Sequence, residues 1–326
     1  MNPSSILLCS SILLLVPACG REGNSVGKGG GGSVPEEASF ARWVPLGKDE
    51  GRFETAIARF EDAKGRVVDL IGAVHIGERA YYEELNRRFR GYEVLLYELV
   101  SATGRIPDPK LRSGNLLSML QTFLGEVLDL SFQLDVIDYG AENFVHADLD
   151  PKALASRMSA LGPRDFLKVF FRSLAVGVKA RKHAREDQVL VFQAMFSLFG
   201  RSRARQLRLL LGKQLLRFDE MLYAQGGKNG RDWPLIGSRN AAAFEVLDTE
   251  LAKGRRKLGI FYGVAHLPDM STRLEKRGFR FLASDWVTAW ECRIPPGERV
   301  RIEEAERVRE ARRKRILERR RKRKGV

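Results

Sequence analysis

Cysteine and histidine are scarce in this chain of 326 residues, and their scarcity excludes several kinds of site. The three cysteines have no paired spacing, so the sequence indicates neither a disulfide framework nor a cysteine-rich zinc knot. Cys292 is the only cysteine outside the first nineteen residues, and we predict that it is a small buried side chain. The chain has four histidines in all: His75, His146, His183 and His266.

Several motifs that mark large enzyme families are also absent. The sequence contains no Gly-x-Ser-x-Gly elbow, no P-loop and no Gly-x-Gly-x-x-Gly fingerprint. The usual local signatures of α/β-hydrolases, nucleoside triphosphatases and dinucleotide-dependent enzymes are therefore missing.

The apolar run near the N-terminus, residues 6–16, is too short to cross a membrane. It has eleven residues, whereas a spanning helix needs about twenty, and it matches the hydrophobic region of a signal peptide. The next residues, "LVPACG", resemble a bacterial lipobox, in which the cysteine carries the lipid. We predict a signal peptide over 1–18 and a lipid anchor at Cys19; a plain cleaved signal, or a short apolar N-terminus without export, are the alternatives.

A glycine- and serine-rich stretch follows the predicted anchor. Residues 19–39 show no apolar pattern and predict a flexible tether, with a reach on the order of 25 Å. We expect the folded domain to cover 40–296. The protein would then be held at the bacterial cell envelope, in the periplasm or on the outer surface.

Positive charge is concentrated at the C-terminus. The formal net charge is +15, and residues 299–326 hold 14 Lys and Arg against 5 Glu, or +9, which leaves +6 for the rest. For an exported protein we expect no nucleic-acid partner, and contact of this basic tail, 297–326, with an anionic membrane surface fits better. A merely solubilising tail is the alternative.

The body of the chain predicts an α/β fold with a central, mainly parallel or mixed sheet. Residues 53–60 and 67–71 suggest a hairpin. Residues 77–91 have helical spacing at Ala80, Tyr81, Leu85 and Phe89, with Gly91 as a stop. Residues 93–100 and 257–266 suggest buried strands, with one or two more over 279–292. Between the two halves of the sheet, about 110–252, we predict a long helical insertion; its candidate helices are 116–130, 151–160, 164–182, 188–199, 204–224 and 238–252.

Two of the four histidines close the same phrase, Gly-x-x-His, at the end of a predicted strand. These are Gly72–His75 and Gly263–His266, and Glu98 lies near the end of a third strand. Because ligands of open α/β sheets bind outside the carboxyl ends of the strands, we expect these side chains to converge. Two histidines and one carboxylate are a donor set for a divalent metal in a hydrolytic site.

In this pattern the chain resembles the TraB/Tiki family, part of a superfamily that includes erythromycin esterases and haem-binding lipoproteins. The matching residues are the two Gly-x-x-His motifs, Glu98 in "LYELV" and Arg239 with Asn240 in "GSRNAAAF", where Ser238 stands in place of the family's Glu. The resemblance implies a metal-dependent peptidase acting on a peptide or small-molecule substrate. His75, His266 and Glu98 would bind Mn²⁺, Co²⁺ or Zn²⁺, and Arg239 would stabilise an oxyanion.

Two alternatives to a hydrolase remain open. One is a non-catalytic haem- or metal-binding lipoprotein, in which Tyr97 or Tyr262 supplies an axial ligand. The other is a scaffold that has lost the site of its family, which the serine at 238 suggests.

Four further polar residues have less specific predictions. His146 and Asp148 lie in a non-helical stretch that also contains Asp138. They could be a further arm of the metal site, but we expect them to support that site or to cap a helix before Pro151. His183 lies in a highly charged segment and is expected to face solvent.

Overall fold

The computed structural model describes residues 40–47, 49–100, 128–153, 156, 204, 205, 207–209, 211, 212, 215, 216 and 236–323. The predicted signal peptide and tether, His183, and most of the predicted helices between 101 and 235 lie outside these residues. Within the described part of the chain, no helix is both long and apolar enough to cross a membrane.

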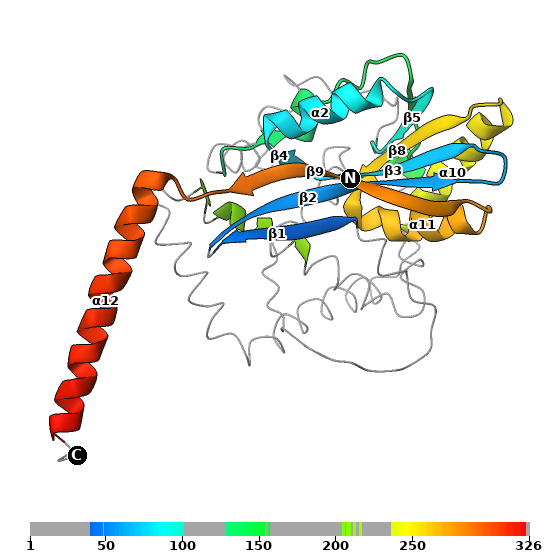
Figure 1. Cartoon of the computed structure of the whole chain (residues 1–326). Helices are drawn as coiled ribbons and strands as arrows, with labels where there is room; N and C mark the ends of the chain where they lie inside the picture. Colours follow the sequence, from blue (N-terminus) through cyan, green and yellow to red (C-terminus); the bar gives the residue numbers. More distant parts are fainter. Residues whose placement is uncertain are drawn as a thin grey trace, which may run out of the picture.

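A mixed sheet of seven strands forms the centre of the protein, so the predicted α/β class is confirmed (Figure 1). The strand order is β1-β2-β3-β8-β5-β7, and β9 pairs with β2. Strands β3, β8, β5 and β7 are parallel, whereas β2 is antiparallel to β1, β3 and β9. The strands are β1 (Ala41–Gly47), β2 (Glu50–Glu61), β3 (Val67–Ala73), β5 (Val94–Tyr97), β7 (Phe144–His146), β8 (Lys257–Gly263) and β9 (Arg280–Cys292).

The predicted hairpin and strand–helix–strand unit are both present. Strands β2 and β3 form the hairpin, and helix α2 (Arg79–Phe89) leads from β3 to β5. The helix buries Tyr81, Leu85 and Phe89 of the predicted apolar set, together with Tyr82, whereas Ala80 is exposed. Strand β8 lies between β3 and β5, so these two strands are parallel but are not neighbours.

Alternation along the strands produces a core on each face of the sheet. In β5, Leu95 packs with α2 on one face, whereas Leu96 packs with α10 (Gly237–Ala252) and α11 (Leu267–Glu275) on the other. Because both faces are covered by helices, the central strands are almost wholly apolar, as the sequence indicated.

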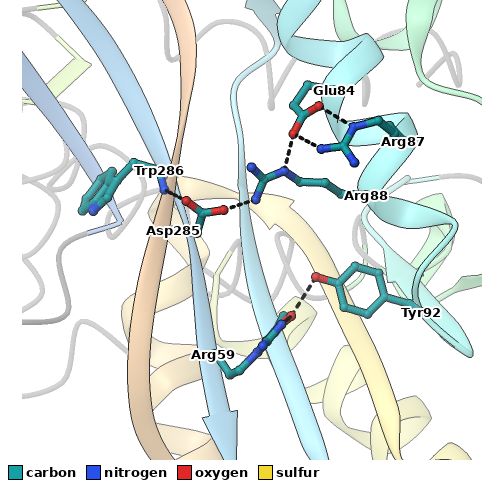
Figure 2. Close-up of polar contacts among 8 residues, drawn as sticks. Arg59, Glu84, Arg87, Arg88, Tyr92, Asp285 and Trp286 are labelled. Atoms are coloured by element: carbon teal, nitrogen blue, oxygen red, sulfur yellow. Dashed lines mark hydrogen bonds and ion pairs between the residues drawn. The ribbon is translucent and has the colours of Figure 1, made fainter.

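Charged side chains hold α2 to the sheet (Figure 2). Arg88 of α2 is paired with Asp285 of β9, and deeper in the same face the buried Asp69 accepts hydrogen bonds from Arg59 and from the Tyr92 hydroxyl. These contacts hold α2 against the sheet, and with it the segment that connects β3 to α2.

The region predicted as a helical insertion is only partly described, and the described part is not purely helical. Helix α10 agrees with the helix predicted at 238–252, and the described positions of 204–216 are helical. However, β7 joins the main sheet beside β5, and β6 (Ser131–Phe132) pairs with β4 (Ile76–Gly77) just before the short helix α5 (Gln133–Val136). Strands of two or three residues are too short for alternation to reveal them in a sequence.

The C-terminal part contains one strand and one long helix. Residues predicted as one or two strands form the single strand β9, and Cys292 at its end is a buried free thiol, as predicted, whose pKa burial raises to about 12. The basic tail forms α12 (Pro296–Arg323), which stands away from the sheet (Figure 1).

Candidate functional site

The parallel strands bring most of the predicted site residues to one edge of the sheet. Ala73 of β3 pairs with Gly263 of β8, and Tyr97 of β5 pairs with both Phe261 of β8 and His146 of β7. The residues that follow these strands are His75, the short 3-10 helix η6 (Val264–His266), Glu98 and Asp148, and they therefore leave the sheet at the same edge.

Glu98 lies at the centre of this edge. Its Oε2 accepts a hydrogen bond of 2.7 Å from the Gly263 N–H, and its Oε1 accepts one of 2.6 Å from Nη2 of Arg239. A Cβ at position 263 would lie 3.3 Å from Oε2, so glycine leaves room for the carboxylate to reach the backbone. Burial alone would raise the pKa of Glu98, but Arg239, His266, His75 and the Gly263 amide hold that pKa well below its usual range.

Arg239 is shared between two buried carboxylates. It lies in the first turn of α10, and its Nε and Nη2 donate hydrogen bonds of 2.9 and 2.6 Å to Asp148, while Nη2 also reaches Glu98. Burial would lower the pKa of Arg239, but the two carboxylates raise it above its ordinary value. The guanidinium therefore orients Glu98 and keeps it charged. A role for Arg239 as a clamp for a substrate oxyanion stays a prediction.

Three residues of the segment after β5 take supporting positions. Asp148 acts on Glu98 through Arg239, and it also accepts a hydrogen bond from the Leu149 N–H. His146 contacts the Leu99 carbonyl through Nε2 at 2.6 Å. Asp138 accepts a hydrogen bond of 3.2 Å from the Gly140 N–H and so belongs to a turn.

The orientation of His266 is set by a buried polar chain. Its Nδ1 lies 2.6 Å from Oδ1 of Asn240, whose Nδ2 contacts the His266 carbonyl at 3.1 Å and Oδ2 of Asp269 at 2.9 Å. Both of these partners accept only, so the Asn240 atom facing them is the NH₂ group, and the atom facing His266 is the amide oxygen. The proton of His266 is therefore on Nδ1, and Nε2 carries a lone pair.

That lone pair faces the carboxylate of Glu98. Nε2 of His266 lies 3.8 Å from Oε1 of Glu98, and both residues are buried apart from a small exposed fraction. Burial lowers the pKa of His266 to about 4, although Glu98 acts to raise it. At neutral pH this histidine is thus an uncharged base next to a charged carboxylate, which suits a proton acceptor or a metal ligand.

His75 differs from His266 because its side chain is exposed. It lies two residues after the end of β3, and its carbonyl accepts a hydrogen bond of 3.0 Å from the Gln133 N–H. Pairing of β4 with β6 places Gln133 here, and its side-chain Nε2 donates to the Tyr139 hydroxyl at 2.6 Å. The Tyr139 ring lies 5.2 Å from that of Tyr97, the residue before Glu98. No local pattern in the sequence marks Gln133 or Tyr139, because their positions depend on pairing across more than fifty residues.

The predicted metal donors are only partly assembled. Among the described residues there is no group of three or more His, Cys, Asp or Glu arranged to hold a metal ion. The spacing of 3.8 Å between His266 Nε2 and Glu98 Oε1 nevertheless fits two ligands of a single cation, with bonds of about 2.0–2.2 Å. The donor chemistry of imidazole and carboxylate suits Zn²⁺, Mn²⁺ or Co²⁺.

The two tyrosines considered as haem ligands have other contacts. The hydroxyl of Tyr262 donates to the Ala147 carbonyl, and burial raises its pKa well above the ordinary value. Tyr97 is also buried, with its ring against Tyr139 and Phe144. A buried tyrosine with a raised pKa is a poor source of the phenolate that ligates haem iron.

Comparison of the chain with protein-family models, curated proteins and solved structures gives no match. The likeness to the TraB/Tiki family rests on the motifs alone.

Proposed function

We propose that this chain is a metal-dependent hydrolase of the TraB/Tiki type, most similar to a peptidase. His75, His266 and Glu98 would hold the divalent ion, which is Mn²⁺, Co²⁺ or Zn²⁺. The observation that carries the proposal is the buried lone pair of His266 facing the charged carboxylate of Glu98 at 3.8 Å. Two electron-pair donors at this spacing repel one another unless a proton or a cation lies between them.

Each buried residue of the site has a definable task. Glu98 remains a carboxylate because Arg239 stabilises its charge. Asp148 accepts hydrogen bonds from the same guanidinium and so holds Arg239 in place. Asn240 holds His266 in the tautomer that directs Nε2 toward Glu98. The metal ion would act as a Lewis acid and lower the pKa of a bound water.

The exposed side of the site is the entry for a peptide substrate in this proposal. His75 is exposed there, and Gln133 lies beside it. The side-chain Oε1 of Gln133 is buried without a hydrogen-bond partner among the described residues.

The placement of the enzyme also belongs to the proposal. Lipid attachment at Cys19 and the tether of 19–39 would hold the domain at the cell envelope. A largely helical insertion over about 110–252, interrupted by the short strands, would lie between the two halves of the sheet.

A peptide library tests the activity. Purified protein is incubated at neutral pH with Mn²⁺, Co²⁺ or Zn²⁺, and products are read by mass spectrometry. Glu98→Gln should reduce cleavage at least about 100-fold, and His266→Ala should abolish it together with metal binding. Glu84→Gln is the matched control, because Glu84 lies on the surface of α2 paired with arginines, and it should retain full activity. Absence of cleavage with every metal, together with stoichiometric haem uptake and a Soret band, would favour the non-catalytic alternative.

A further inference from the structure

The C-terminal helix α12 has a strongly uneven distribution of charge. Residues 296–306 contain two Arg against four Glu, a net charge of −2. Residues 307–323 contain eleven Lys and Arg against two Glu, a net charge of +9. Acidic residues at the start of a helix and basic residues at its end both stabilise the helix dipole. The net charge of +9 in 307–323 is more than the helix dipole needs, and this excess positive charge lies at the end of the helix that is farther from the body of the protein.

The near end of α12 is bound to the body of the protein. Glu50 at the start of β2 accepts hydrogen bonds of 2.7 Å from the Ile294 N–H and from Arg299. Glu298 is paired with Arg205 at 3.2 Å. These contacts hold the base of the helix, and the basic end extends away from the sheet (Figure 1).

The pattern of α12 does not suit another helix as its partner. Among the side chains of α12 that the structure describes, the exposed large apolar ones are Val300, Val308 and Ile316, at intervals of eight, and the sequence adds Ile302 and Leu317. Eight residues advance around a helix by about 80°, so these side chains form no continuous stripe, whereas a coiled coil needs an apolar seam with a repeat of 3.5 residues.

The basic end does suit a surface that carries phosphate groups. Nine of its eleven basic residues are arginine, whose planar fork binds phosphate in a bidentate manner. Arginine also binds nucleic-acid phosphates and guanine edges, although residues 296–323 contain no aromatic residue, Asn or Gln for further base contacts. Because the lipobox-like "LVPACG" predicts export, a membrane is the favoured source of the phosphate groups, and a nucleic acid is an outcome of the test.

We propose that the basic end of α12 docks on the phosphate headgroups of an anionic lipid membrane. It spans about 25 Å for its seventeen residues, long enough to contact several headgroups. The lipobox-like "LVPACG" points to the same surface. The helix would thus be a second attachment point, independent of the proposed hydrolytic activity.

The test is the binding of the full chain, carrying Cys19→Ser to remove the lipid, to vesicles. One set of vesicles contains phosphatidylcholine alone, and the other an equimolar mixture with phosphatidylglycerol. We expect binding only to the mixture, and a loss of at least about 10-fold when the salt rises from about 0.1 M to about 1 M. Changing all five basic residues of 319–323 to glutamine should weaken binding at least about 100-fold, since each contributes up to roughly fivefold near such a surface.

A matched control removes the same number of charges from the surface of the body. Glutamine replaces Lys64, Arg90, Arg255, Lys276 and Arg280, all of which are exposed. This control should bind within about threefold of the parent chain, because none of the five charges belongs to α12. Equal loss in both variants would overturn the proposal, as would failure of the parent chain to bind the mixed vesicles. Tighter binding to duplex DNA than to vesicles at the same salt would assign the helix to nucleic acid instead.

Discussion

Replacing Arg239 with leucine removes the one cation that two buried carboxylates share. The side chains of Glu98 and Asp148 are 12% and 0% exposed, and that of Arg239 is 6% exposed. Among the hydrogen bonds of the described residues, Glu98 then keeps the one from the Gly263 N–H, and Asp148 keeps the one from the Leu149 N–H. Removing one partner of a buried ion pair leaves the other charge unpaired in a medium of low polarity. The free energy of unfolding should therefore fall by about 3–5 kcal/mol. For a domain of this size that corresponds to a fall in Tm of about 10 °C.

Thermal unfolding in a buffer with chelator measures this effect without a metal ion. Arg87→Leu is the control, because Arg87 forms an exposed pair with Glu84 and its loss should cost less than about 1 kcal/mol. Adding Glu98→Gln and Asp148→Asn to the Arg239→Leu chain should recover more than half of the lost stability, because the uncompensated charges are then gone. A fall in Tm no larger than that of the control would refute the assignment of Arg239 as the partner of both carboxylates.

The same variant should show a defined dependence on pH. In the parent protein the pKa of Glu98 lies below its ordinary value of 4.5, so the ion pair stabilises the fold above that pH and less as the pH falls toward the lower, folded-state pKa. In Arg239→Leu burial raises the pKa of Glu98, so the variant loses stability as the pH rises above 4.5. The difference in Tm between the two proteins should therefore narrow from pH 7.5 to about pH 4.5, and a difference that stays constant would contradict this cause.

Two further predictions concern the site and the anchor. Asn240→Leu removes the acceptor that holds the proton of His266 on Nδ1, so metal affinity should fall about 10- to 100-fold in a competition titration, and unchanged affinity would remove Asn240 from this role. Cys19→Ser should move the protein into the soluble fraction after a wash at high salt. A Cys19→Ser protein that stays with the membrane after this wash would argue against lipid attachment at Cys19.

The sequence predicted those parts of the fold that have strong local patterns. Apolar runs marked β3, β5 and β8, and helical spacing marked α2. The position of β8 between β3 and β5 could not be predicted in this way, because strand order depends on contacts between segments that are far apart in the chain. The three-residue strand β7 is too short to show a period.

The same distinction applies to the site. Glu98 stood out because a carboxylate ending an apolar strand needs a partner, and that partner is Arg239. The sequence could not show that Arg239 also pairs with Asp148, or that Asn240 sets the tautomer of His266, because both depend on distances across the fold. The group that approaches Gly263 at the exit of its strand is the Glu98 carboxylate, and this contact also depends on distances across the fold.

Metal analysis of protein purified without chelator tests the central proposal most directly. Elemental analysis of the parent chain should find about one Zn, Mn or Co per chain, as expected for a site with two histidines and a carboxylate. His266→Ala should lose the metal, whereas His146→Ala should retain it, because the imidazole of His146 is bonded to the Leu99 carbonyl. A parent chain that holds no metal after dialysis against each of these ions, or a His266→Ala chain that still holds a full equivalent, would contradict a metal site between His266 and Glu98.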